Sequence, residues 1–360
     1  MVFDLTEEQR MVQEMAQSFA QKEVLPKAAE LDETGRFPEE LVRQMAGLGL
    51  MGMAVPEEYG GAGMDSICYA IAMEEIARAC ASTAVILSVN NSLACAPILS
   101  FGSEEQKRKY LVPLASGEHL GCFGLTEPEA GSDAGAQKTT AARDGGHYVL
   151  NGTKNFITNA TQADTCVLFA MTDREKKHKG VTAFILDMKL QGITIGKKEA
   201  KLGICASATA SIILEDVKIP AANRLGNEGE GFKIAMRTLD GGRIGIAAQS
   251  IGVAQAALDA SVKYARGRNQ FGQAISKFQG IRWMIADMVT EIEAARQMTL
   301  AAAALKDRGK KFTIQASMAK LYASEMVNRI TAKALQIHGG YGFIKDYAVE
   351  RYYRDARVFT

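Results

Sequence analysis

The sequence is poor in the side chains that hold covalently linked or metal-centred folds together. Its 360 residues include only six cysteines and four histidines, and no two cysteines stand at C-x-x-C spacing. A disulfide framework and a structural zinc site are therefore not expected, no metal site is predicted, and a reducing compartment fits best. Excess charge is also lacking, since the formal net charge is +1. Neither nucleic acid nor an anionic membrane surface is expected as a partner.

Long apolar runs and targeting features are likewise not expected. We find no run of the roughly 18 apolar residues that a membrane helix needs. The N-terminus is acidic and enters a helix at once, with Thr6 as N-cap and Gln9 completing a capping box. No signal or transit peptide is therefore predicted. These features favour a bacterial cytoplasmic protein, and a processed protein of the mitochondrial matrix would look the same.

The hydrophobic pattern divides the chain into helical, β-rich and helical parts. Helical periodicity runs from Thr6 to about Ala115, with breaks expected at Gly35, in the loop from Pro56 to Gly63, and at Pro97. Short β-rich runs occupy the stretch from Cys122 to Val217. Within it, Asn151-Gly152 predicts a type I′ hairpin turn.

Helical periodicity returns from Gly231 onward. One apolar stripe consists of Ile281, Ile285, Met288, Ile292 and Ala295. A polar turn is expected from Lys306 to Lys311, and Gly339-Gly340 is expected to end a helix. The order predicts an α+β protein with a helical N-terminal domain (1–118), a β-barrel or sheet domain (119–225) and a C-terminal helical bundle (226–360).

Two segments of the β-rich part carry side chains suited to binding a polar ring. The stretch from Phe123 to Asp133 is rich in small residues, and its backbone amides and hydroxyl groups could bind an anion or a ring carbonyl. Loop statistics alone slightly favour an ordinary turn for that stretch. The stretch from Lys154 to Thr158 places an aromatic ring beside a hydroxyl, which could cover a flat heterocycle. Phe156 taken alone is more often a core residue.

These segments belong to a longer series of motifs that covers essentially the whole chain. The series reads L-T-E-P-x-A-G-S-D, N-G-T-K-x-F-I-T-N, G-K-K-E-x-K-L-G-I, G-F-K-I-A-M, L-D-G-G-R-I-G-I-A, R-x-Q-F-G, L-Q-I-H-G-G-Y-G and Y-R-D-A-R. In this order the sequence resembles the acyl-CoA dehydrogenases, and most of it is similar to their short-chain (butyryl-CoA) branch.

The resemblance implies an enzyme that binds FAD at two sets of residues. The first set would hold the isoalloxazine ring and comprises Phe123, Leu125, Thr126, Gly131, Ser132, Phe156, Ile157 and Thr158. The second set would hold the diphosphate and adenine of a neighbouring subunit's FAD and comprises Arg268, Phe271, Gln279, Gln336, Ile337, Gly339 and Gly340. Arginine suits this role because its planar fork matches phosphate oxygens. The resemblance further implies a homotetramer built as a dimer of dimers.

The substrate implied by the resemblance is a short-chain acyl-CoA. Ser132 would lie where flavin and acyl-CoA meet, and Asp240 and Arg243 resemble contacts to the CoA nucleotide. An ion pair between helix positions i and i+3 is the structural alternative for Asp240 and Arg243. The product would be trans-2-enoyl-CoA, and the electrons would pass to an electron-transferring flavoprotein.

The resemblance implies that the catalytic base is a glutamate that removes the α-proton, with a pKa raised by burial in the closed pocket. In the short-chain branch it lies in an I-Y-E-G-T stretch shortly after Y-R-D-A-R, so it is expected beyond Thr360. The family's second position for the base holds Gly242 here. Glu127 and Glu129 are the nearest carboxylates by motif; Glu127 is expected to be structural, and no proton-transfer role is assigned.

Other interpretations stay open on the same scaffold. An acyl-CoA oxidase, a dehydrogenase of branched, cyclic or dicarboxylic acyl-CoA, or a non-catalytic flavin- or CoA-binding protein would share most of these motifs. A dicarboxylate substrate would need an arginine, and the stretch from Ser88 to Leu93, where the glutaryl branch carries one, has none. Cys205 stands where the short-chain pattern usually has arginine, and a small buried residue is the favoured interpretation there.

Overall fold

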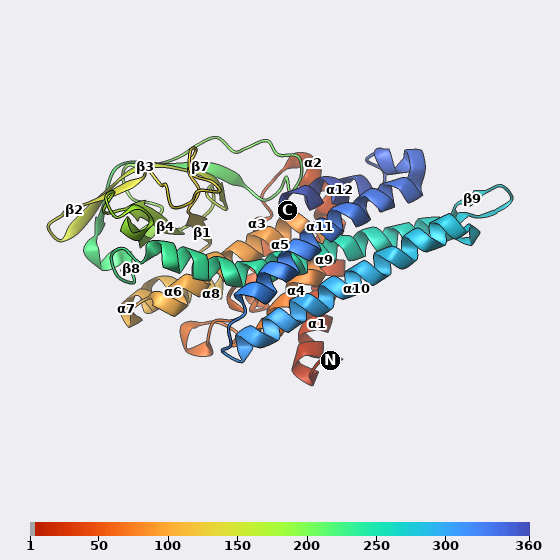
Figure 1. Ribbon diagram of the computed structural model, residues 1–360, viewed down its shortest axis with the longest axis horizontal. Helices are drawn as coiled ribbons and strands as arrows, with labels where there is room; N and C mark the ends of the chain where they lie inside the picture. The colour runs from red at the N-terminus through yellow and green to blue at the C-terminus, as the bar shows by residue number, and fades with distance from the viewer. Residues whose placement is uncertain (1–3) are drawn as a thin grey trace.

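The computed structural model describes residues 4–360 as a sheet region at one end of an elongated set of helices (Figure 1). The N-terminal helices are α1 (Glu7–Phe19), α2 (Ala28–Thr34), α3 (Glu39–Gly47), α4 (Ser66–Ala79), α5 (Ala81–Ser88), α6 (Ala96–Phe101), α7 (Glu104–Gln106) and α8 (Val112–Ser116). The predicted capping box is confirmed, because Gln9 N donates to Thr6 Oγ1 at 3.2 Å while the Gln9 side chain accepts from Thr6 N at 3.1 Å. Gly35 ends α2 with φ 63°, as expected.

The break predicted at Pro97 is wrong. Helical backbone continues from α5 through a π-helical stretch, Val89–Cys95, into α6, where Pro97 occupies the first turn. A proline inside a helix donates no hydrogen bond and crowds the preceding turn. The wider π-helical turn before Pro97 accommodates both effects without ending the helix.

The same helical run, Ala81–Phe101, corrects the expectation that no segment has the length of a membrane helix. Its 21 residues have a mean hydropathy of 1.6, so by length and composition it could cross a membrane. Of its most apolar 18-residue stretch, 61% is buried inside the protein. Ile86, Leu87 and Ala94 have no exposed surface. A central position in the core accounts for this composition.

The sheet lies at the left of Figure 1 and contains the expected β-rich runs. Its strands follow the order β6-β7-β3-β2-β4-β5-β8, with β1 paired in parallel to β4. The bounds are β1 (Gly121–Gly124), β2 (Thr140–Asp144), β3 (His147–Thr158), β4 (Thr165–Met171), β5 (Val181–Asp187), β6 (Ile193–Ile195), β7 (Thr209–Pro220) and β8 (Arg224–Leu225).

The hairpin predicted at Asn151-Gly152 is also wrong. The turn lies earlier, at Gly145-Gly146, where β2 and β3 meet with Asp144 opposite His147. Asn151 and Gly152 lie inside β3, at a shift of its register against β7. Gly152 has φ 145°, and a Cβ there would come within 2.5 Å of Thr139 Oγ1. The glycine therefore serves a β-bulge and a close backbone approach rather than a turn.

The C-terminal part consists of long helices. They are α9 (Gly231–Gly267), α10 (Gln279–Asp307), α11 (Thr313–His338) and α12 (Val349–Ala356), and the short strands β9 (Asn269–Gln270) and β10 (Gln273–Ala274) join α9 to α10. In the predicted stripe of α10, Met288, Ile292 and Ala295 are buried while Ile281 and Ile285 pack partly buried against the core. Gly339 ends α11, as expected. The α+β architecture with a sheet region between helical regions is thus confirmed, and the domain limits at residues 118 and 225 stay predictions.

Candidate functional site

Two adjoining cavities lie beside α5 and α9; the first also borders the sheet, whereas helical residues alone line the second. The first, which we call the central cavity, has a volume of about 600 Å³. The second, the side cavity, has about 270 Å³. They share four wall residues, Val85, Val89, Leu93 and Ile246. A ligand group in one cavity would therefore lie next to a group in the other.

Besides this shared wall, three parts of the chain that are distant in sequence line the central cavity. Thr158, at the end of β3, lines one side, and the loop from Lys201 to Ile204 lines another. Residues Arg357 to Phe359, just after α12, complete it. The motif series contained this loop and this helix, but nothing in the sequence indicated that they meet.

The contact between the loop and α12 is close and partly charged. Asp355 is buried and accepts a hydrogen bond from Ile204 N at 2.5 Å. Burial raises the pKa of Asp355 to about 6, against the opposing effect of Arg351 and Arg354. Ile204 has φ 53°, a left-handed conformation that costs a β-branched residue energy and needs support from its surroundings. The hydrogen bond to Asp355 provides part of that support.

Cys205 lies beside this contact and is half-buried. Burial and the nearby Asp32 carboxylate raise the pKa of its thiol, which keeps it protonated at neutral pH. Asp32 accepts a hydrogen bond from Arg354 Nη2 at 2.5 Å, so the arginine partner of Asp32 lies on α12. The favoured interpretation of Cys205 as a small buried residue is therefore met only in part, since the side chain keeps some exposed surface.

The side cavity is mainly apolar and has a few polar side chains on its wall. Ser88, Ser92 and Gln249 line it together with Gly242 on α9. Gln249 is completely buried; its Nε2 donates to Gly245 O at 3.1 Å, while its Oε1 has no hydrogen-bond partner in the protein. An unpaired buried oxygen is costly unless a ligand or water satisfies it. Sequence reasoning missed Gln249, which follows the L-D-G-G-R-I-G-I-A motif without belonging to it.

Asp240 and Arg243 form the i, i+3 ion pair that was the structural alternative. Asp240 also accepts a hydrogen bond from Thr313 Oγ1 at 2.7 Å. Arg243 lines the side cavity together with Lys320, whose pKa is lowered by burial and by the neighbouring arginine. The ion pair leaves Arg243 at the wall of the cavity, and its contact with a substrate stays a prediction.

The loop expected to hold a flavin ring begins at β1. Phe123 and Leu125 are buried, and Thr126 is half-buried with its carbonyl accepting from Asn155 N at 2.8 Å. Gly131 and Ser132 are exposed further along the loop and line neither of the two cavities. Thus Thr126 is hydrogen-bonded to β3, whereas Ser132 does not line the central cavity that Thr158 faces.

The segment Phe156–Thr158 alternates between surface and interior. Phe156 is 62% exposed with φ 57°, Ile157 is buried, and Thr158 faces the central cavity. The interpretation of Phe156 as a core residue is therefore wrong. The register of β3 against β7 shifts between Lys154 and Ile157, and this irregularity turns the aromatic ring outward.

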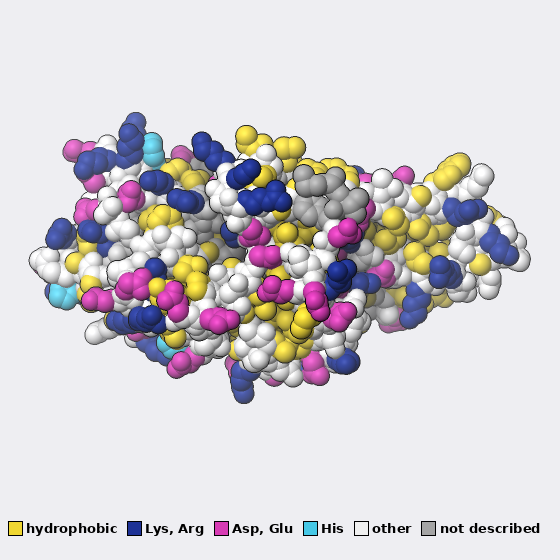
Figure 2. Space-filling view, turned by 90° about the horizontal axis from the view of Figure 1, so that it is seen from below, with side chains coloured by type: hydrophobic (Ala, Val, Ile, Leu, Met, Phe, Trp, Pro, Cys, Tyr) yellow, Lys and Arg dark blue, Asp and Glu magenta, His cyan; other side chains and the backbone are white. Residues whose placement is uncertain are grey.

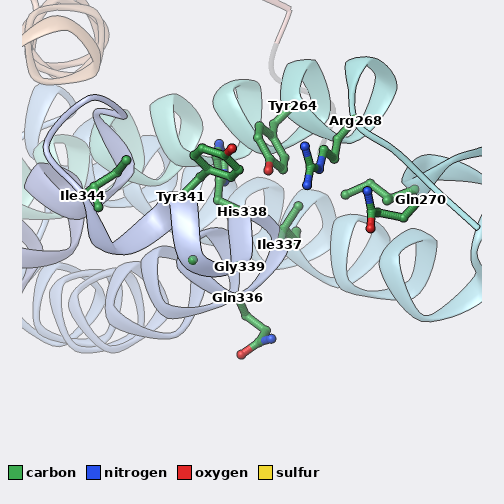
Figure 3. Close-up of a pocket in the computed structure, with 11 residues that line it drawn as sticks. Tyr264, Arg268, Gln270, Gln336, Ile337, His338, Gly339, Tyr341 and Ile344 are labelled. Carbon is green, nitrogen blue, oxygen red and sulfur yellow. The ribbon is translucent and has the colours of Figure 1, made fainter.

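The second predicted set gathers around an outer cavity of about 480 Å³ near the end of α9 (Figure 3). Arg268, Ile337, Gly339 and Gly340 line it, as does Gln336, whose side chain points away from Arg268 in Figure 3. Gln279 and Phe271 do not line it; Gln279 begins α10, and Phe271 is 93% exposed on the β9–β10 hairpin.

Aromatic rings that the sequence did not single out complete the outer cavity. Tyr264 stacks on His338 with ring centroids 4.3 Å apart, and the Arg268 guanidinium lies 5.4 Å from the centre of the Tyr341 ring. Burial lowers the pKa of His338, which favours its neutral form. Within residues 4–360, Arg268 makes no ion pair. Its charge is therefore available for an anionic ligand.

The central and outer cavities lie in different parts of the molecule. Thr126 and Thr158 belong to the sheet region at the left of Figure 1, whereas Arg268 lies beside β9 at the opposite end. The two predicted sets of FAD-binding residues therefore lie in different regions of the single chain. For a metal, the described part of the chain contains no group of three or more His, Cys, Asp or Glu side chains arranged to hold an ion.

Known proteins share both the sequence and the fold. The family models for the N-terminal, middle and C-terminal domains of acyl-CoA dehydrogenase match residues 6–118, 122–217 and 229–360. The short-chain specific acyl-CoA dehydrogenase of Clostridium acetobutylicum is 53% identical over 358 residues, which are 99% of this chain and 94% of that protein.

Solved structures agree with the sequence matches. Butyryl-CoA dehydrogenase from Megasphaera elsdenii superposes with a TM-score of 0.98 at 48% identity, covering 100% of this chain and 95% of that one. A chain of the structure described as the electron transferring flavoprotein of Acidaminococcus fermentans gives 0.98 at 51% identity, covering 100% and 94%. On the strength of its motifs, its cavities and these matches, the chain belongs to the acyl-CoA dehydrogenase family.

Proposed function

We propose that this protein oxidises short-chain acyl-CoA to trans-2-enoyl-CoA with FAD and passes the electrons to an electron-transferring flavoprotein. The observation that carries the proposal is the side cavity adjoining the central cavity across four shared apolar wall residues. A flat ring held at Thr158 would meet a short acyl chain held beside Gln249. The similarity to butyryl-CoA dehydrogenase and to a chain described with an electron transferring flavoprotein supports the substrate and the acceptor.

The residues present fit FAD as the cofactor. Thr126 and Thr158 offer hydroxyl and backbone groups to the polar edge of the ring, and Phe156 offers an exposed aromatic face. The unpaired Arg268 and the glycines at the end of α11 suit a diphosphate. When bound, FAD supplies the acceptor for the β-hydrogen that leaves as hydride.

The size of the side cavity favours a short acyl chain. Ligand cavities commonly span about 300 to 1,000 Å³, and the side cavity lies just below that range at about 270 Å³. Its wall is mainly apolar, which suits a hydrocarbon, so the small volume is what limits the length of the acyl chain. The segment from Ser88 to Leu93 that forms part of this wall contains no arginine, and this agrees with an uncharged acyl end.

The proton from the acyl α-carbon requires a base that the two cavities do not supply. Neither is lined by an aspartate or glutamate. Glu127 is fully engaged in structural hydrogen bonds and Glu129 pairs with Lys138 at the surface. We place the base on an I-Y-E-G-T-like stretch following Thr360. Arg357 to Phe359 line the central cavity, so residues that follow them would begin next to it.

We further propose that FAD is shared between subunits of a homotetramer. One chain separates its ring-binding loops from its outer cavity, so a second copy is needed to complete each site. Hydrophobic side chains also gather on the arm of long helices at the right of Figure 2. The large apolar residues of α10 and α11 that are exposed in the single chain are Trp283, Val289, Ile314, Met318 and Leu321. Such exposed apolar surface is typical of subunit interfaces.

The proposed activity is tested by anaerobic titration of the yellow protein with butyryl-CoA. The 360-residue chain and a chain extended through an I-Y-E-G-T stretch are compared, because loss of a positioned base typically costs about 10²- to 10⁴-fold in rate. The extended chain should bleach its flavin and should reduce an electron-transferring flavoprotein. Rapid bleaching followed by fast reoxidation in air would instead indicate an oxidase. A flavin that stays oxidised in both chains would contradict dehydrogenation and leave a binding protein.

A further inference from the structure

A completely buried lysine lies beneath the two loops assigned to the flavin ring. Lys154, on β3, has no exposed surface, and its ammonium group has three acceptors. It donates to Glu127 Oε1 at 2.7 Å, to Gln137 Oε1 at 2.9 Å and to Leu125 O at 3.2 Å. Each of its three protons therefore has a partner, and none is left for a ligand.

The carboxylate of Glu127 is equally occupied. One oxygen accepts from Lys138 N at 2.6 Å, and the other accepts from Thr139 N at 3.1 Å as well as from Lys154. The positive charge of Lys154 and these donors lower the pKa of Glu127, in opposition to its burial. The pair is therefore an ionised, internally satisfied unit that joins three segments of backbone.

The joined segments are those that carry the ring-binding residues. Leu125 and Glu127 flank Thr126 on both sides, so the ammonium group of Lys154 holds the loop immediately before and after that hydroxyl. Lys154 is also the last residue of β3 before the shift in register that exposes Phe156 and turns Thr158 to the central cavity. One side chain thus fixes the distance between the two halves of the ring site.

Stability alone does not explain a charged pair at this position. Burying two charges costs several kcal/mol of desolvation, and well-packed apolar residues often replace a buried pair without loss of stability. An apolar pair, however, would supply no hydrogen bonds to Leu125 O, Thr139 N or Lys138 N. Directional bonds of this kind suit irregular backbone that must keep one conformation.

We propose that Lys154 and Glu127 are positioning residues for the flavin: they set the spacing of the Thr126 loop and the Phe156–Thr158 segment, and through it the affinity for the isoalloxazine ring. The inference rests on the proposed FAD site. It assigns neither residue a contact with FAD or with substrate.

The test compares Lys154→Met, Glu127→Gln and the double variant as purified oligomers with bound FAD. Lys154→Met leaves a buried carboxylate without its partner and should lower both thermal stability and FAD affinity. The double variant removes both charges, so its thermal stability should recover. Its FAD affinity should nevertheless stay about tenfold or more below that of the unmodified protein, since the bonds to Leu125 O are lost. Affinity is measured by the gain of flavin fluorescence on dilution, and the shape of the bound flavin absorption band is recorded.

Glu74→Gln serves as the matched control, because it removes the charge from a partly buried ion pair with Arg296 between α4 and α10, outside both cavities. It should lower stability and leave FAD affinity and spectrum unchanged. If the double variant regains FAD affinity together with stability, the pair is only structural and the inference fails. Glu127→Gln, the mildest change, decides the question if the lysine variants do not fold: unaltered affinity and spectrum would overturn it. A wild-type protein that takes up no FAD would instead overturn the proposed function.

Discussion

The buried Asp355 predicts how the stability of this protein depends on pH. Its pKa is raised to about 6 by burial, whereas an exposed aspartate titrates near 3.8. Between these pH values the folded protein holds a proton that the unfolded chain has released. The contribution of Asp355 to the free energy of unfolding therefore falls as the pH rises from about 4 to about 6, and it stays low at higher pH.

Replacing Asp355 by Asn removes this cost while keeping an oxygen that accepts from Ile204 N. The shift of about two pH units corresponds to about 3 kcal/mol in total, at about 1.4 kcal/mol per unit. About half of it, roughly 1.5 kcal/mol, falls between pH 5 and pH 7.5. The free energy of unfolding of Asp355→Asn minus that of the unmodified protein should thus increase by this amount between the two pH values.

The assay is urea denaturation at pH 5 and pH 7.5, with protein and FAD concentrations held constant because both shift the apparent stability. Asp346→Asn is the control, since Asp346 is exposed, and its difference from the unmodified protein should be nearly independent of pH. An equally pH-independent difference for Asp355→Asn would refute the reasoning: it would mean that Asp355 is ionised in the folded protein at pH 5, stabilised by Arg351 and Arg354 more strongly than burial opposes it.

Three further changes are predicted from the cavities and contacts. Arg268→Ala should weaken FAD binding about 10- to 100-fold and weaken the oligomer in parallel, since it removes the unpaired cation of the outer cavity. Fluorescence titration measures FAD binding, and sedimentation measures the oligomer. Loss of FAD from an unchanged assembly would argue against a shared site. Gly203→Ala should cost about 1 to 3 kcal/mol in unfolding free energy, because its Cβ would come within 2.5 Å of the Arg354 carbonyl, whereas Gly146→Ala, with open space around it, should change stability little. Gln249→Ala should enlarge the side cavity and raise the ratio of hexanoyl-CoA to butyryl-CoA oxidation by the extended chain; an unchanged ratio would show that Gln249 does not limit acyl length.

The regular parts of the fold could be predicted because they rest on local signals. The capping box at Thr6, the apolar stripe of α10 and the glycine ending of α11 depend on residues three or four positions apart, and the structure contains all three. Two of the wrong predictions concern residues with more than one structural use. Asn151-Gly152 predicts a turn, but a glycine is needed at position 152 because Thr139 approaches the backbone there. Pro97 predicts a break in the helix, but the preceding π-helical turn accommodates it.

The site was predictable in its parts but not in its assembly. Thr126, Thr158 and Arg268 were recognised through motifs, whereas the meeting of the Lys201–Ile204 loop with α12 depends on contacts between positions about 150 residues apart. Gln249 and Tyr264 carry no local signal, because each lies on a long helix where its neighbours determine its surroundings. The ion pair of Asp240 and Arg243 was foreseen only as an alternative, since the spacing of the two residues suits either role.

The distance between the ring-binding loops and the outer cavity has a genetic consequence under the proposed sharing of FAD. A chain damaged at Arg268 still presents intact loops around Thr126 and Thr158, and a chain damaged in those loops still presents an intact outer cavity. When both alleles are expressed together, mixed assemblies contain some sites built entirely from sound halves. Two alleles, one mutated in the ring-binding loops and the other in the outer cavity, should therefore complement each other. Two alleles mutated in the same one of these regions should not.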